Sequence, residues 1–183
     1  MSTLTDRPRT ALVIIDAQRR VLSKAWRRDE AVANMLTVLE KARETRTPVV
    51  WVQHTDDQLE SGSEDWQLVP ELSPLDSEAI VHKQYGDAFE ATDLEDVLED
   101  AHVGSLVVAG AQSDECIRST IHGGFTRGYD VTLVADAHTA EDLTEWGAPT
   151  PDKVIAHTNL YWSFQTAPGR TAAVMPAAEV AFA

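Results

Sequence analysis

Short apolar runs that alternate with helical patterns constrain the fold of this chain more than any other feature. Continuous apolar runs are typical of strands buried on both faces of a sheet. We expect strands at Thr10–Ile15, Val49–Val52, Ala79–His82, Ser105–Ala109, 128–134 with its turn, and Ala172–Met175. Between these runs, helical spacing of apolar residues or a helix-start signal predicts helices at 29–46, 92–101, 116–127 and 151–160. This alternation predicts an α/β fold with a mostly parallel sheet and helices on both faces.

The size and charge of the chain narrow its class. The 183 residues contain no recognisable repeat or linker, so we expect a single domain over residues 1–183. A formal net charge of −15 argues against nucleic acid and anionic membranes as partners. No apolar run is long enough to span a bilayer, and no signal peptide is recognisable. A cytoplasmic location is therefore the expectation.

Cys116, the only cysteine, follows the apolar run Ser105–Ala109 and lies in the first turn of the predicted helix 116–127. Ser113 or Asp114 could cap that helix. Backbone N–H groups and the helix dipole at such a position lower a thiol pKa and can hold an oxyanion. Taken alone, this stretch fits an inert buried cysteine better than a reactive one, because free cysteines are among the most buried residues.

Two further reactive side chains come at the ends of predicted strands. Asp16 directly follows the first strand, and Lys83 directly follows the third. In parallel sheets, ligands bind outside the carboxyl ends of the strands, near the point where the strand order reverses. Asp16, Lys83 and Cys116 would all lie on that edge, where an acid, an amine and a thiol together make a nucleophilic site.

Three segments resemble the isochorismatase-like cysteine hydrolases, a superfamily that also contains nicotinamidases and N-carbamoylsarcosine amidases. The segments are Ala11–Gln18, Val81–Phe89 and Val108–Ile117, with Thr120 and Gly128–Val131 beyond them. The resemblance implies a three-layer, Rossmann-like fold with a six-stranded, mostly parallel sheet. It also implies an Asp16–Lys83–Cys116 catalytic triad, a cis peptide bond between Ala111 and Gln112, and an oxyanion hole formed by the N–H groups of Gln112 and Cys116.

Departures from the family pattern limit the expected chemistry. The nicotinamidase metal motif, Asp-x-His after the second strand, is replaced by Gln53-His54-Thr55-Asp56-Asp57, so we expect no metal and no cofactor. The presence of Cys116 favours hydrolysis of a C–N bond in a small amide, lactam or carbamoyl compound. A vinyl ether hydrolase of the isochorismatase type and a non-catalytic binding or assembly protein are the alternatives.

Substrate choice is expected to depend on the long loop from His54 to Ser77 and on side chains near the triad. The candidate substrate-binding residues are Gln18, Trp51, His54, Tyr85, Phe89, Ser113, Ile117 and Trp162. The aromatic run Tyr161–Phe164, together with the resemblance, also favours a homo-oligomer, a dimer or a higher assembly. A closed hydrophobic core beneath the last helix would explain the same aromatic residues nearly as well.

Overall fold

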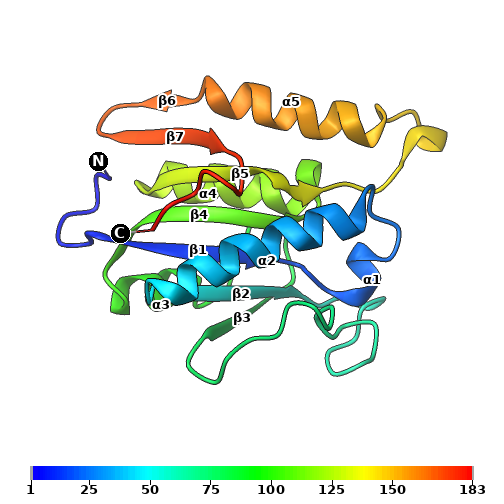
Figure 1. The fold of residues 1–183 in the computed structure, drawn as a ribbon, viewed down its shortest axis with the longest axis horizontal. Coiled ribbons are helices and arrows are strands. Elements are labelled where there is room, and N and C mark those ends of the chain that lie inside the picture. Colours follow the sequence, from blue (N-terminus) through cyan, green and yellow to red (C-terminus); the bar gives the residue numbers. More distant parts are fainter. Residues whose placement is uncertain (1, 183) are drawn as a thin grey trace.

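The computed structural model describes residues 2–182, and it has an α/β fold built on one central sheet (Figure 1). The strands follow the order β3-β2-β1-β4-β5-β7-β6. They are β1 (Arg9–Ile15), β2 (Val49–His54), β3 (Ala79–Lys83), β4 (Val103–Ala111), β5 (Asp130–Thr139), β6 (Thr166–Ala167) and β7 (Arg170–Met175). The helices are α1 (Arg19–Leu22), α2 (Arg28–Glu44), α3 (Leu94–Asp100), α4 (Arg118–Arg127) and α5 (Pro151–Ser163), with a π-helical turn η1 (Ser113–Ile117) and a 3₁₀ turn η2 (Thr144–Trp146).

The predicted fold class is confirmed, with one difference in the number of strands. Neighbouring strands from β3 to β7 pair in parallel, whereas β6 pairs with β7 in antiparallel fashion. The sheet therefore has seven strands rather than the six expected. The extra strand, Thr166–Ala167, is two residues long and carries no apolar run that the sequence pattern could have revealed.

Helices cover both faces of the sheet, as alternation along β1 requires. Leu12 and Ile14 point to one face and pack with the buried side of α2. Val13 and Ile15 point to the other face and share a core with residues of α3, α4 and α5. Because residues 11–15 of β1 are buried on both sides, their continuously apolar sequence has a direct structural cause.

The strand order reverses between β1 and β4, the two central strands. From β1 the chain builds outward through β2 to β3, and from β4 it builds outward through β5 on the other side. Gly110 lies where the two strands approach closely, since a Cβ atom there would come within 2.0 Å of the carbonyl oxygen of Ile15. The carboxyl ends of β1 and β4 therefore meet at the switch point, and they lead directly into Asp16 and η1.

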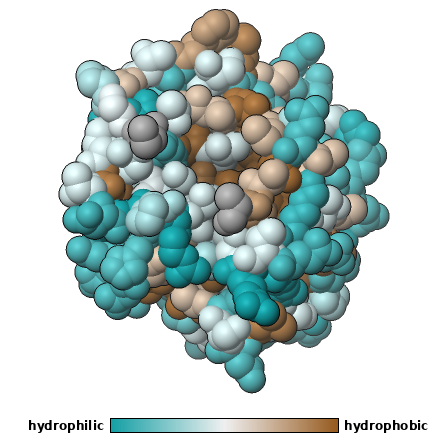
Figure 2. Space-filling model, turned by 60° about the vertical axis from the view of Figure 1, so that its left-hand side comes forward, coloured by the Kyte–Doolittle hydropathy of each residue, from teal (hydrophilic) through white to brown (hydrophobic). Residues whose placement is uncertain are grey.

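The surface is mainly hydrophilic, with exposed apolar side chains at one end of the molecule. Figure 2 shows hydrophobic residues gathered toward the top of the view, the height at which Figure 1 draws α5 and β6. Leu160 on α5 and Phe164 directly after it are both more than half exposed. Within residues 2–182, no helix is both long enough and apolar enough to cross a membrane.

Candidate active site

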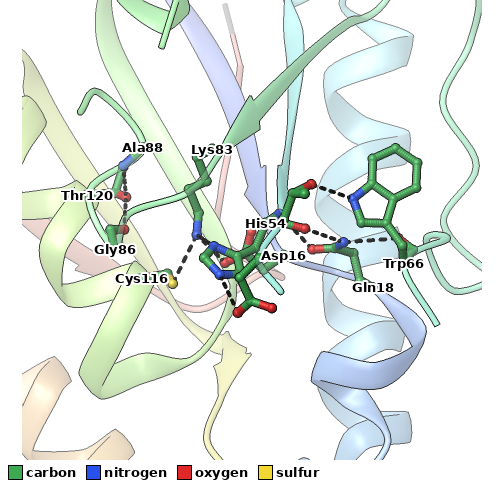
Figure 3. A network of polar contacts seen from close by, with 11 residues as sticks. Asp16, Gln18, His54, Trp66, Lys83, Gly86, Ala88, Cys116 and Thr120 are labelled. Atoms are coloured by element: carbon green, nitrogen blue, oxygen red, sulfur yellow. Dashed lines mark hydrogen bonds and ion pairs between the residues drawn. The ribbon is translucent and has the colours of Figure 1, made fainter. Parts of the chain in front are cut away.

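Lys83 is buried at the centre of a polar cluster at the carboxyl edge of the sheet (Figure 3). Its Nζ atom is 2.7 Å from Asp16 Oδ2, 3.1 Å from Cys116 Sγ and 3.2 Å from His54 Nδ1. Burial opposes the charge on Lys83, but electrostatic attraction to Asp16 and Cys116 outweighs it and raises the pKa of the ammonium group. The structure thus brings together the three residues predicted as a triad, with a protonated amine between an acid and a thiol.

Asp16 is held by the local backbone at the end of β1. Its φ angle of 51° is in the left-handed region, which Asp tolerates better than most residues, and its N–H donates to the carbonyl of Val52. One carboxylate oxygen, Oδ2, accepts from Lys83. The other, Oδ1, is buried and receives no hydrogen bond from the described residues. Burial raises the pKa of Asp16, more than the Lys83 charge lowers it, so this carboxylate can act as a base.

Cys116 sits within η1, a π-helical turn that begins directly after the cis peptide bond between Ala111 and Gln112. The carbonyl of Gln112 accepts from the N–H groups of both Glu115 and Ile117, so the turn that carries the thiol is built around this one carbonyl. The cis bond that the resemblance implies is therefore present, and it places Gln112 beside the turn that carries Cys116.

The expectation of a lowered thiol pKa at Cys116 is wrong in this structure. Burial, followed by repulsion from the Asp16 carboxylate, raises the pKa of the Cys116 thiol to about 12, and Lys83 compensates only in part. The sequence showed the helix start but not the depth of the site or the adjacent carboxylate. The thiol is therefore protonated at neutral pH until a base removes its proton.

The expected helix cap is also wrong, because neither Ser113 nor Asp114 caps η1 or α4 with its side chain. Ser113 is instead fully buried, with Oγ 2.7 Å from His138 Nδ1. His138 Nε2 in turn lies 3.0 Å from Asn159 Oδ1. Ser113 therefore joins η1 to β5 and α5 rather than facing a ligand.

A cavity of about 440 Å³ opens above the thiol. Asp16, His54, Gln112 and Cys116 line it, together with several residues that sequence analysis did not select. These are Arg20, Val21, Gln58, Leu59, Gly86, Glu115, Ser119 and Glu141. The rule that ligands bind at the carboxyl ends of strands could have predicted Glu141, which lies just after the end of β5. Glu115 could have been predicted because it directly precedes Cys116 in the chain.

Four of the eight predicted substrate-binding residues belong to the hydrophobic core instead. The two apolar clusters on either side of the sheet contain four of the candidates, whose side chains face inward: Trp51, Phe89, Ile117 and Trp162. Tyr85 is half exposed beside a neighbouring hollow, outside the cavity over Cys116. Of the eight candidates, only His54 lines that cavity.

Gln18 has a structural task of its own. Its Nε2 donates to the carbonyl groups of His54 and Trp66, and its Oε1 accepts from the N–H of His54. Because both ends of its side-chain amide bind the protein itself, Gln18 fixes the end of β2. The prediction that Gln18 binds substrate is therefore wrong. On the opposite side of the site, Thr120 Oγ1 accepts from the N–H of Ala88 and ties the loop after β3 to α4 (Figure 3).

The loop between β2 and β3 contributes one wall of the cavity. Asp56, Gln58 and Leu59 reach the cavity from this loop. Leu59, Val69 and Leu72 are buried, so much of the loop packs against the body of the protein. Within residues 2–182, no group of three or more His, Cys, Asp or Glu side chains is arranged to hold a metal ion.

Comparison with known proteins identifies a family. Residues 10–149 match the model of the isochorismatase domain. Streptothricin hydrolase from Streptomyces noursei is 33% identical over 147 residues, which cover 75% of this chain and 57% of that protein. Ureidoacrylate amidohydrolase RutB from Cronobacter sakazakii is 26% identical over 74% of this chain and 80% of its own. The crystal structure of an isochorismatase from Pseudomonas putida superposes with a TM-score of 0.85 at 29% identity, over 93% of this chain and 89% of that one.

Proposed function

The chain belongs to the isochorismatase family of hydrolases, and on that premise we propose that it is a cysteine hydrolase that cleaves a C–N bond of a small molecule. Amides, lactams and carbamoyl compounds are the substrate classes. The observation that carries the proposal is the position of Lys83 Nζ, 2.7 Å from Asp16 and 3.1 Å from the only thiol of the chain. The names of two relatives, a streptothricin hydrolase and an amidohydrolase, support the same reaction class.

The first half of the reaction forms a thioester. Asp16 takes the proton of the Cys116 thiol through its unpartnered Oδ1, and the thiolate attacks the carbonyl carbon of the substrate. The N–H groups of Gln112 and Cys116 stabilise the resulting oxyanion. As the C–N bond breaks, Asp16 returns the proton to the departing nitrogen, which leaves as an amine, and the acyl group stays on sulfur.

The second half releases the acid. A water molecule loses a proton to Asp16 and attacks the thioester carbonyl, and the C–S bond then breaks. The departing thiolate recovers its proton from Asp16, which restores the starting state. Lys83 stays protonated throughout, because its contacts with Asp16 and Cys116 raise its pKa, and its charge stabilises the thiolate in both halves.

These proton transfers through Asp16 agree with the raised pKa of the Cys116 thiol. A site with a permanent thiolate would need no base, whereas a thiol with a pKa of about 12 does, and the buried carboxylate of Asp16 is beside it. A vinyl ether hydrolase does not require the thiol. A reaction that depends on Cys116 therefore separates the proposal from that alternative.

The test is a screen of small primary amides, lactams and carbamoyl compounds against the wild-type protein and Cys116→Ala. We expect hydrolysis of at least one C–N substrate by wild type, no turnover by the variant, and an acyl adduct on Cys116 in mass spectra of the quenched reaction. Turnover that persists in Cys116→Ala would contradict the thioester route. A protein that hydrolyses nothing in the screen and forms no acyl adduct on Cys116 would favour the non-catalytic alternative.

A further inference from the structure

His54 contacts Lys83 and lines the cavity above Cys116, and the mechanism above leaves it without a role. Lys83 carries three N–H donors, and three acceptors surround it within hydrogen-bond distance: Asp16 Oδ2, Cys116 Sγ and His54 Nδ1. The ammonium group is fully buried, so none of these acceptors is replaced by bulk water. Its hydrogen-bonding capacity is therefore saturated by the protein, and Lys83 keeps no donor for a substrate.

This arrangement determines the protonation of the imidazole ring. A lysine ammonium can only donate, so Nδ1 of His54 must be the acceptor and carry a lone pair. The other ring nitrogen, Nε2, lies 3.1 Å from Asp56 Oδ2 and donates its proton to that carboxylate. The ring is thus a neutral imidazole in the Nε2–H form, with a polar partner at each nitrogen.

Both residues are themselves held in place. The main chain of His54 is clamped on both sides by the side-chain amide of Gln18, at 2.8 and 2.9 Å. Asp56 Oδ1 accepts from the N–H groups of Gln58 and Leu59, at 2.7 and 2.8 Å, which turns Oδ2 toward the ring (Figure 3 shows the His54 and Lys83 part of this chain). A ring that only filled space at the end of β2 would not need an acceptor aimed at Lys83 and a fixed carboxylate behind it.

From these contacts we propose that His54 and Asp56 form a positioning relay for Lys83. Asp56 fixes the ring and its tautomer, and Nδ1 of His54 takes the third N–H of Lys83, so that the remaining two N–H groups point at Asp16 and Cys116. His54 is a positioning residue that acts through Lys83, and its side chain also lines the cavity. The proposal rests on the proposed function only in that Cys116 is the group that Lys83 serves.

The first test measures the rate at which iodoacetamide alkylates Cys116 at pH 8, read by mass spectrometry, which needs no knowledge of the substrate. His54→Asn and His54→Leu are the matched pair, because they are similar in size and open the same space, but only asparagine keeps an acceptor near Nδ1. We expect the leucine variant to react about tenfold more slowly than the asparagine variant. In the leucine variant one buried N–H group of Lys83 has no acceptor, and the free-energy cost of such an unsatisfied donor corresponds to a factor of about ten or more. Equal rates in the two variants would overturn the relay.

A control variant and a second measurement complete the test. His82→Leu makes the same chemical change one residue before Lys83, at an exposed position where the ring packs at a tilt against Trp66, and should alter the rate by no more than about twofold. In the unmodified protein, ¹⁵N NMR of the histidine rings should show His54 as the neutral Nε2–H tautomer, assigned by the resonances lost in His54→Asn. A proton on Nδ1 would overturn the proposal even if the leucine variant failed to fold, and the NMR result does not depend on whether the protein hydrolyses amides.

Discussion

Lys83 Nζ and Asp16 Oδ2 form a buried ion pair at 2.7 Å, with neither side chain more than 2% exposed. The pair joins β3, at the edge of the sheet, to β1 in its centre. Removing one partner from such a pair leaves an uncompensated buried charge, which typically costs about 3–5 kcal/mol of stability. The pair therefore supports both the fold and the candidate chemistry, and the two roles can be separated by experiment.

Asp16→Asn is expected to abolish turnover, because positioned proton transfer contributes typically about 10²–10⁴-fold. It is also expected to lower the free energy of unfolding, since Lys83 loses its counter-charge. The double variant Asp16→Asn/Lys83→Met should recover much of the lost stability while remaining inactive. Urea denaturation and turnover measured on the same preparations check both statements. Activity close to wild type in Asp16→Asn would contradict its assignment as the base.

The alkylation rate of Cys116 is expected to rise continuously with pH and to show no plateau between pH 7 and pH 10. Only the thiolate reacts, and a thiol pKa of about 12 keeps the thiolate a minor species over this range. Reaction with iodoacetamide at several pH values, quenched after set times and read by mass spectrometry, measures the alkylation rate of Cys116 as a function of pH. A plateau near neutral pH would mean a preformed thiolate, contrary to the burial of the site and the nearby carboxylate.

The acid limb of the kcat/KM profile is expected to lie above the ordinary Asp pKa of about 3.9, because burial raises the pKa of Asp16. The sign follows from the base role: the reaction needs the unprotonated carboxylate, so activity falls as pH decreases through the raised pKa. A pH series with a substrate found in the amide screen, buffered at constant ionic strength, provides the measurement. An acid limb at or below the ordinary value would show that Asp16 is not the titrating base.

Activity is expected to survive metal removal, since the Asp-x-His spacing is absent after the second strand. Dialysis against a chelator, followed by assay with and without added zinc or iron, checks this. If activity were lost and either metal restored it, His54 and Asp56 would be assigned as metal ligands. That result would also contradict the relay to Lys83.

A homo-oligomer is expected, with Phe164 and Leu160 at or near the interface, because both are large apolar side chains left more than half exposed by the fold. Light scattering at moderate salt should give a mass above the 20.1 kDa of a single chain, and Phe164→Asp should lower it. Leu75→Asp, a change at another half-exposed leucine on the β2–β3 loop, is the control and should leave the mass unchanged. A wild-type mass near 20.1 kDa at all micromolar concentrations would assign both side chains to the surface of a monomer.

The sheet and the order of its chemistry could be predicted from local pattern. Residues 11–15 and 106–109 are continuously apolar because they are buried on both faces, and a strand of this kind is visible in any single sequence. The rule that parallel strands present their carboxyl ends at one edge was then enough to group Asp16, Lys83 and Cys116. These features depend on the composition of a few consecutive residues and on one general property of sheets.

The identity of the cavity wall and the electrostatics of the thiol depended on tertiary packing. Trp51 and Trp162 lie in the core because of the direction each side chain takes from its strand or helix, whereas Arg20 and Glu141, far apart in sequence, both line the cavity. A pKa is set by burial and by charges within a few ångströms, and neither is encoded in the spacing of residues along a chain. The helix-start pattern at Cys116 therefore predicted a lowered pKa, while the partial burial of the thiol and the carboxylate of Asp16 raise it.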